Sequence, residues 1–183
     1  MAKIFWLFVL YSFLGFLLEV AFARITHAGK QDRKCLYVFP LCPVYGFGAL
    51  AILALVPLAR GSWPVIFLLG AAAATGVEYL YDLLCDKFLH VRFWDYSHLP
   101  ANVGGRVCLL FTSFWGLLAL VVVQLIQPGM ELLVNLIPGW IFFPAALLLS
   151  ADILFTVLLL SRTRHTDSLC WYRQIQDRLQ HHS

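Results

Sequence analysis

Long apolar runs fill most of the chain, and short polar stretches separate them. A membrane-crossing helix needs about 20 apolar residues in succession, and we sought runs near that length. Five are found, followed by a polar C-terminal tail at 162–183; the expected spans are 4–23, 45–59, 63–85, 107–126 and 136–161. The pattern predicts an all-α, polytopic transmembrane helix bundle with about five spans, folded as a single integral membrane domain over residues 1–183.

The second expected span differs from the others because it is short and follows a proline-rich stretch. Pro40 and Pro43 precede it, and Gly46 and Gly48 lie in its first turns. Prolines and glycines resist a regular helix, and broken backbone at membrane depth is tolerated only where protein or a wet cavity covers it. We therefore expect a bent or re-entrant entry into this span.

Composition agrees with the membrane class. Hydrophobic residues make up 61% of the 183 residues and charged residues only 13%, whereas soluble domains carry about 25% charged residues. The net charge of +3 is small and its carriers are dispersed, which argues against a nucleic-acid partner. The lipid bilayer is the expected partner, and the cell membrane is the expected location.

Lysine and arginine residues predict the orientation, because they collect on the cytoplasmic side of membrane proteins. With five spans, one side holds only Lys3 and Arg60, and the opposite side holds the other eleven of the 13 basic residues. This bias places the N-terminus outside and the C-terminus in the cytoplasm. Cleavage of a signal peptide after Ala23 would leave the basic 24–44 loop outside the cell, against this rule, so we expect no cleavage. All five cysteines fall on the cytoplasmic side, where thiols stay reduced.

Four carboxylates lie inside the expected spans, namely Glu19, Glu78, Asp82 and Asp152. A charge within the hydrocarbon layer costs at least about 2.5–3.5 kcal/mol, so such residues point to a polar site. At about 1.5 Å of rise per residue, all four fall in the cytoplasmic half of the membrane. They are expected to open onto one cavity reached from the cytoplasm. The alternative is that they form helix–helix hydrogen bonds or, for Asp82, a wetted position near a helix end.

The loop at 86–106 holds further candidate binding residues. Gly104 and Gly105 could turn backbone amides toward a ligand before the fourth span, and a helix N-terminus favours anions. Arg106 adds a planar donor fork, Asn102 adds an amide, and Asp95 is expected to orient Arg106 through a charge-assisted bond. The alternative is an interfacial loop with aromatic anchors and a cytoplasmic arginine.

Metal binding is a second use for these side chains. Glu19, Glu78, Asp82, Asp95 and Asn102 offer only oxygen ligands, which suit Mg²⁺ or Mn²⁺; Glu19, Glu78 and Asp82 are the candidate metal ligands. The chain has no G-x-x-x-x-G-K-[ST] sequence, so it cannot hydrolyse ATP in the P-loop manner by itself.

Several of these stretches resemble the CmpB-like family of ABC-transporter permeases, which are small polytopic membrane proteins. The resemblance covers roughly residues 4–125, and its motifs are Tyr11-Ser12-x-x-Gly15-x-x-x-Glu19, Pro40-x-x-Pro43-x-Tyr45-Gly46-x-Gly48, Glu78-Tyr79, Trp94-Asp95-Tyr96-Ser97 and Asn102-x-x-Gly105-Arg106-Val107-Cys108. It implies a transport role. Because this chain lacks an ATPase motif, an ABC role would require a separate ATPase subunit.

The first functional hypothesis is therefore a small transporter or permease subunit with a cytoplasm-facing polar site. The sequence leaves open whether this subunit forms a homo-oligomer. Glu19, Glu78 and Asp82 would bind an ion, a proton or a cationic group, and Asn102 and Arg106 an anionic or polar group. The second hypothesis is a membrane-embedded enzyme that acts on a lipid or isoprenoid headgroup with a divalent metal. The third is a structural or regulatory membrane protein whose polar groups serve only packing.

Overall fold

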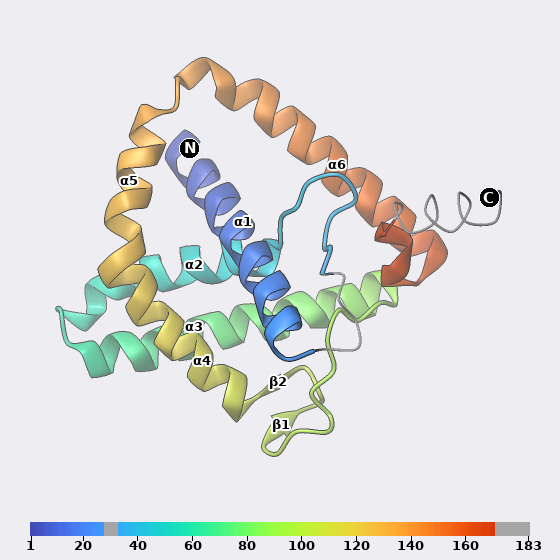
Figure 1. Cartoon of the computed structure of the whole chain (residues 1–183), viewed down its shortest axis with the longest axis horizontal. Coiled ribbons are helices and arrows are strands. Elements are labelled where there is room, and N and C mark those ends of the chain that lie inside the picture. Colours follow the sequence, from blue (N-terminus) through green and yellow to red (C-terminus); the bar gives the residue numbers. More distant parts are fainter. Residues whose placement is uncertain (28–32, 171–183) are drawn as a thin grey trace.

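The structure is a computed structural model that describes residues 1–27 and 33–170, and it is built mainly from helices (Figure 1). The α-helices in the described part of the chain are α1 (Ala2–Ile25), α2 (Pro43–Leu55), α3 (Trp63–Leu84), α4 (Leu109–Val121), α5 (Gln127–Leu136) and α6 (Phe142–Thr163). Short 3-10 or π-helical turns adjoin them, namely η1 (Val56–Ala59), η2 (Cys85–Leu89), η3 (Val122–Ile126), η4 (Gly139–Ile141) and η5 (Thr166–Leu169). Most of the predicted polar tail, residues 171–183, lies outside the described residues.

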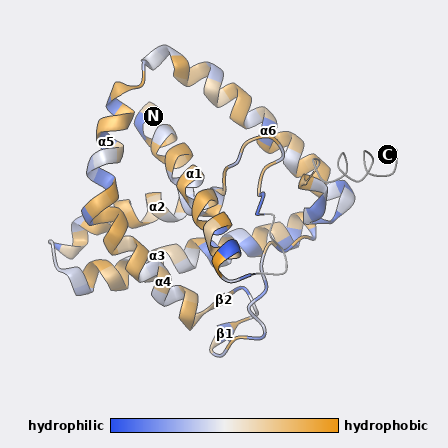
Figure 2. Ribbon diagram, viewed as in Figure 1, coloured by the Kyte–Doolittle hydropathy of each residue, from blue (hydrophilic) through white to orange (hydrophobic). Residues whose placement is uncertain are grey.

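Four helical segments within the described residues are long and apolar enough to cross a membrane, judged by length and composition. They are Ala2–Ile25, Trp63–Leu89, Leu109–Leu136 and Gly139–Thr163. The helix Pro43–Ala59 is apolar but shorter, as the short second run of the sequence indicates. Figure 2 shows hydrophobic residues along most of these helices, and hydrophilic ones near the C-terminal end of α1 and after α6. The prediction of a mostly helical protein with several apolar helices long enough to span a membrane is confirmed.

The helical segment Leu109–Leu136, which corresponds to the fourth apolar run of the sequence, is longer than expected. The run was expected to end at residue 126 before Gln127-Pro128-Gly129, but the helix continues through η3 into α5 and ends at Leu136. Pro128 directly follows the π-helical turn η3, in which the amide of Gln127 bonds to the carbonyl of Val122. A proline and a π-turn are places where a long helix bends without ending. The chain leaves the helix only at Ile137, whose extended ψ of 121° is the conformation favoured before a proline.

Four helices form the packed centre of the molecule. α2 packs against both α1 and α3, α3 packs against α4, and α1 also contacts α5. Small residues permit the close contacts: a Cβ on Gly70 of α3 would lie 2.2 Å from the Cβ of Ala119 on α4. The central position of α2 explains how so short a helix is held, because its apolar surface is covered by neighbours on two sides.

Residues 33–42 enter the bundle without forming a helix, which agrees with the expected bent entry to the second run. Leu36 and Leu41 are buried against Leu149 of α6. The backbone amides of Val38 and Phe39 donate to the two carboxylate oxygens of Asp152, at 3.0 and 2.9 Å. Non-helical backbone at this depth needs such partners, and α6 provides them from near its middle (Figure 1).

The segment between η2 and α4 contains a small hairpin that the all-α prediction did not include. Strands β1 (Asn102–Val103) and β2 (Val107–Cys108) pair antiparallel. Gly104 and Gly105 turn the chain with φ of 60° and 69°, and the amide of Arg106 donates to the carbonyl of Val103 at 3.1 Å. Positive φ at both central positions is typical of the type I′ turn. The two glycines therefore make a turn, where the sequence suggested amides presented to a ligand.

Candidate functional site

Glu78 lies near the C-terminal end of α3 and is 5% exposed. Its Oε1 accepts a hydrogen bond from the hydroxyl of Tyr96 at 3.0 Å, and its Oε2 accepts one from the indole nitrogen of Trp115 at 3.0 Å. Both donors are neutral. Within residues 1–27 and 33–170, no lysine or arginine comes within ion-pair distance of Glu78. The carboxyl group is therefore hydrogen-bonded by two neutral donors, and no cation lies beside it in the described residues.

Glu19 lies nearly two turns before the end of α1 and is partly exposed. Its Oε1 accepts a hydrogen bond from the hydroxyl of Tyr45 on α2 at 2.8 Å. Its Oε2 lies 3.7 Å from a guanidinium nitrogen of Arg33. Glu19 thus has one neutral and one cationic partner, and its greater exposure leaves it open to solvent.

Aromatic rings join these two carboxylates into one cluster. The ring centroids of Tyr45 and Trp115 lie 4.9 Å apart, so the donor of Glu19 contacts the donor of Glu78. Gly15 makes this possible, because a Cβ there would lie 2.2 Å from Cγ of Tyr45. We call the group Glu19, Tyr45, Glu78, Tyr96 and Trp115 the acid site. The expected convergence of acids from separate helices is thus observed for Glu19 and Glu78.

Tyr96 reaches the acid site from the loop after α3. Its ring stacks on Phe111 of α4, with centroids 4.6 Å apart. Burial raises the pKa of the Tyr96 phenol far above its usual range, and the nearby Glu78 carboxylate raises it further. The phenol therefore stays protonated at any physiological pH and acts as a permanent hydrogen-bond donor to Glu78.

Asp82 lies one helical turn beyond Glu78 and belongs to a different group, the arginine network of Asp82, Asp86, Arg92 and Arg106. Arg106 donates to Asp82 and, at 2.5 Å, to Asp86. Arg92 lies 3.4 Å from the same oxygen of Asp82. The hydrogen bond to Asp86 is the main factor that raises the pKa of Arg106. The guanidinium expected to bind an anion is therefore engaged by two carboxylates of its own chain.

Asp95 and Asn102 organise the hairpin segment. Asp95 Oδ1 accepts a hydrogen bond from the amide of Ser97 at 2.9 Å, which holds the pKa of Asp95 below its usual range. Its ion pair, at 3.9 Å, is with Arg92, whereas the sequence suggested Arg106. Asn102 donates to the carbonyl of Leu99 at 2.7 Å and accepts from the amide of Gly105 at 3.0 Å. Both side chains thus stabilise the loop that carries Tyr96.

Asp152, the fourth intramembrane carboxylate of the sequence, lies away from the acid site on α6. It is occupied by the amides of Val38 and Phe39, and Thr156 one turn further on accepts from the amide of Tyr37 at 3.0 Å. The expectation that all four carboxylates open onto one cavity is therefore wrong for Asp152, and it also fails for Asp82, which is 0% exposed and held by Arg92 and Arg106. The physical reason is that a non-helical segment inserted beside α6 needs hydrogen-bond acceptors there.

The described residues also bear on the metal hypothesis. No group of three or more histidine, cysteine, aspartate or glutamate side chains in residues 1–27 and 33–170 is placed to hold a metal ion. Glu19 and Glu78 are occupied by aromatic donors, and Asp82 by arginines. In this arrangement they form no ready-made site for Mg²⁺ or Mn²⁺.

Sequence reasoning missed the donors of the acid site. Tyr45 and Tyr96 stand inside the quoted motifs but were not assigned as partners of the acids, and Trp115 drew no attention within its apolar run. One signal was available: a buried carboxylate needs donors, and an indole N–H inside an apolar span needs an acceptor.

Comparison with known proteins identifies a family. No curated protein and no solved structure matched the chain. A family model described as “Putative ABC-transporter type IV” matches residues 6–159, a longer stretch than the motifs of the sequence cover. The match, with the four long apolar helices, identifies a membrane protein of a transport-related class. The chain belongs to this ABC-transporter family.

Proposed function

We propose that this protein is the membrane subunit of a transporter, and that its acid site binds a cation or the cationic group of a solute. The observation that carries the proposal is the set of partners around Glu78. Its carboxylate is buried and satisfied by two aromatic donors, with no cation beside it in the described part of the chain. An ionisable residue in such a place within a membrane span is by default a candidate for function.

The chemistry of the acid site favours a cation in two ways. Glu19 and Glu78 bring two carboxyl groups together beside a single arginine, Arg33. Tyr45 and Trp115 reach the carboxyl groups through their polar edges, the hydroxyl and the indole N–H, and aromatic rings also attract ammonium groups. Carboxylates combined with aromatic rings thus match an ammonium ion, and the site would repel an anion.

The arginine network and the hairpin have a positioning role in this proposal. The amide of Tyr96 donates to the carbonyl of Gly105 at 2.8 Å, and the indole of Trp94 donates to the carbonyl of Arg106 at 2.9 Å. Gly105 must be glycine, since a Cβ there would lie 2.7 Å from Oδ1 of Asp95. Arg106, Asp82, Asp95 and Asn102 would hold the loop so that the hydroxyl of Tyr96 meets Glu78.

Orientation and energy supply complete the proposal. Glu19 and Glu78 lie near the C-terminal ends of α1 and α3, beside the segments that carry most of the basic residues. The positive-inside rule then places the acid site toward the cytoplasm of a multi-pass protein of the cell membrane. Because the chain has no P-loop sequence, transport would be driven by a separate ATPase subunit.

The test is a cation-dependent thermal unfolding experiment on the purified full-length protein in nanodiscs, with sodium, potassium and ethylammonium chlorides as probes. A cation that binds the folded state raises the melting temperature. At least one probe is expected to do so for the natural protein and not for Glu78→Gln. The matched control is Glu131→Gln, which removes an exposed acid of α5 that is paired with Lys3. Equal shifts for all three proteins would overturn the proposal.

A further inference from the structure

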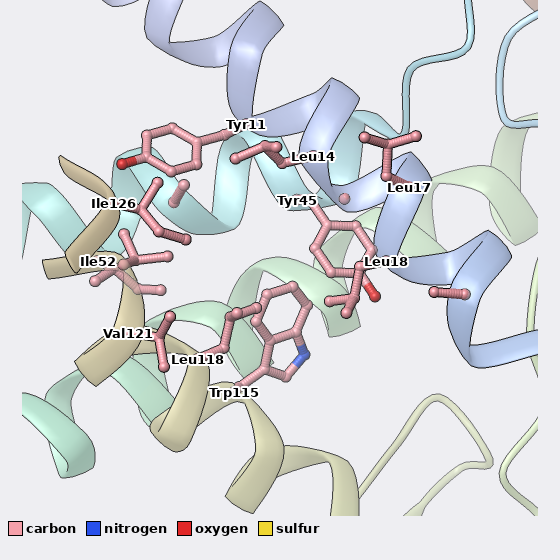
Figure 3. A pocket seen from close by; sticks show the side chains of 14 residues that line it. Tyr11, Leu14, Leu17, Leu18, Tyr45, Ile52, Trp115, Leu118, Val121 and Ile126 are labelled. Carbon is pink, nitrogen blue, oxygen red and sulfur yellow. The ribbon is translucent and has the colours of Figure 1, made fainter. Parts of the chain in front are cut away.

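A cavity of about 420 Å³ lies between α1, α2 and α4, and Tyr45 and Trp115, the hydrogen-bond donors of the acid site, line part of it (Figure 3). Its size falls in the range of about 300–1,000 Å³ that is typical of pockets for small organic ligands. Its walls are apolar side chains, among them Leu14, Ile52, Leu118 and Ile126. We call this cavity the apolar chamber, and a cavity of this character holds hydrocarbon in preference to water.

The chamber has two different ends. At one end are Tyr45 and Trp115, the donors to Glu19 and Glu78. At the other end is Tyr11, whose hydroxyl donates to Gln127 at 2.7 Å. Figure 3 shows the oxygen of Tyr11 on one side of the chamber, and the oxygen of Tyr45 and the nitrogen of Trp115 on the other. Since Tyr11 and Glu19 are eight residues apart on α1, the polar ends are separated by about 12 Å.

The side of the chamber opens toward the region where lipid would lie. Leu17, Leu18 and Val121 line the chamber and are 46%, 44% and 41% exposed. Exposed apolar side chains on a membrane-spanning helix face the acyl chains of the bilayer. A hydrocarbon chain could therefore enter the chamber from the side. A helix, with a diameter of about 10 Å, is too wide to enter in this way.

We infer that the substrate of the acid site is a membrane amphiphile that carries an ammonium head group on a single hydrocarbon chain. The chain lies in the apolar chamber between α1 and α4, and the head group lies against Glu19 and Glu78. This inference rests on the proposed function and adds a substrate class to it. Charge complementarity selects the head group, since two carboxylates face one arginine there, and the chamber's apolar wall selects the chain.

The experiment uses the full-length protein in nanodiscs and a dodecylammonium probe with a photoreactive diazirine on its chain. Cross-linked peptides are mapped by mass spectrometry. A dodecanol probe with the same diazirine reports the chain without the charge, and ethylammonium reports the charge without the chain. Labelling by dodecylammonium is expected on the chamber residues of α1 and α4, at least about tenfold above labelling by dodecanol, which corresponds to about 1.4 kcal/mol.

Two pairs of variants separate the chain from the head group. Ala21→Trp fills the chamber at an exposed lining residue, and Ala72→Trp makes the same change at an exposed residue of α3 outside the chamber. Ala21→Trp should abolish chamber labelling and leave the ethylammonium melting shift intact, and Ala72→Trp should change neither. Glu78→Gln should bring dodecylammonium labelling down to the dodecanol level, while Glu131→Gln should not.

The outcomes distinguish this inference from the function on which it rests. If ethylammonium stabilises the protein through Glu78 but no probe labels the chamber, the amphiphile inference is wrong and the cation site stands. If dodecanol labels the chamber as strongly as dodecylammonium and Glu78→Gln changes neither, the ammonium head group and the cation site are both wrong. Should Ala21→Trp fail to fold, the ratio of the two probes on the natural protein still decides the question.

Discussion

Glu78 and Asp152 are two carboxylates with the same burial and different partners. Each is 5% exposed and each lies within a helix long and apolar enough to span a membrane. Asp152 accepts the backbone amides of Val38 and Phe39, so its charge stabilises the inserted segment 33–42. Glu78 accepts only side-chain donors, and these belong to aromatic residues near a cavity.

This difference teaches that the cost of a buried charge does not by itself identify a binding site. A carboxylate that satisfies backbone amides is committed to the fold, because removing it leaves buried donors without partners. A carboxylate held by neutral side-chain donors can exchange one of them for a ligand. Asp82 is a third case, because Arg106 and Arg92 neutralise its charge. Of these three carboxyl groups, only Glu78 has neither a cation nor a backbone amide as its partner in the described residues.

The largest effect on stability is expected for Asp152→Ala. The substitution leaves the amides of Val38 and Phe39 buried without acceptors, and each such donor costs about 1–3 kcal/mol. The free energy of unfolding should fall by about 2–5 kcal/mol in a thermal unfolding measurement. Thr156→Val, which removes the acceptor of a single amide, is the milder comparison. A folded Asp152→Ala protein that had lost only its cation response would place Asp152 in the binding site and contradict this role.

Arg106→Gln should have the next largest effect. It removes the cation that bonds to both Asp82 and Asp86 and leaves Asp82, which is 0% exposed, with Arg92 alone. A buried carboxylate that loses its partner is destabilising, and we expect the melting temperature to fall by several degrees. Arg106→Lys, which keeps the charge but not the fork that reaches two carboxylates, should recover part of the loss. Unchanged melting with loss of binding to an anionic ligand would restore the anion site suggested by the sequence.

Much of the fold could be predicted from apolar run lengths alone. The runs beginning near residues 4 and 63 match α1 and α3 closely, and the short second run is α2 with η1. The predicted end of the fourth run was wrong because Pro128 was taken as a stop, whereas a long helix can bend at a proline and a π-turn and still continue. The hairpin at 102–108 was missed because two-residue strands leave almost no pattern in a sequence.

The acid site could be predicted in part. The expected depth in the membrane and the free-energy cost of a charge there pointed to Glu19 and Glu78. Helix geometry placed Glu78 and Asp82 on one face of their helix. Their shared helix face does not indicate that Glu78 accepts a hydrogen bond from Trp115 while Asp82 accepts one from Arg106. These donors come from α4 and from a loop, both distant in the sequence. Partners of buried charges are decided by tertiary contacts, which single-chain patterns do not encode. The same holds for Asp152, whose partners are backbone amides and carry no side-chain signal.

A smaller effect on stability is expected for Glu78→Gln, which tests the comparison most directly. Glutamine keeps one oxygen for the hydroxyl of Tyr96 and places its amide toward the indole of Trp115, so about one hydrogen bond is lost, or about 1 kcal/mol. Chemical or thermal unfolding should show this modest change while the cation response disappears. A destabilisation as large as that of Asp152→Ala would mean that Glu78 is structural too, and the distinction between the two acids would fail.

The smallest effect is expected for Tyr45→Phe. The change removes the hydrogen bond of 2.8 Å to Glu19 and keeps the ring contact with Trp115. Because Glu19 is partly exposed, water can replace the lost donor, and the free energy of unfolding should fall by only about 0.5 kcal/mol, the low end for one hydrogen bond. A double-mutant cycle with Glu19→Gln checks the assignment: if the two residues act through one bond, the double variant should be less destabilised than the sum of the single variants. Strict additivity would mean that Tyr45 and Glu19 act independently. Tyr45 would then not connect Glu19 to Trp115 and Glu78, and Glu19 would not belong to the acid site.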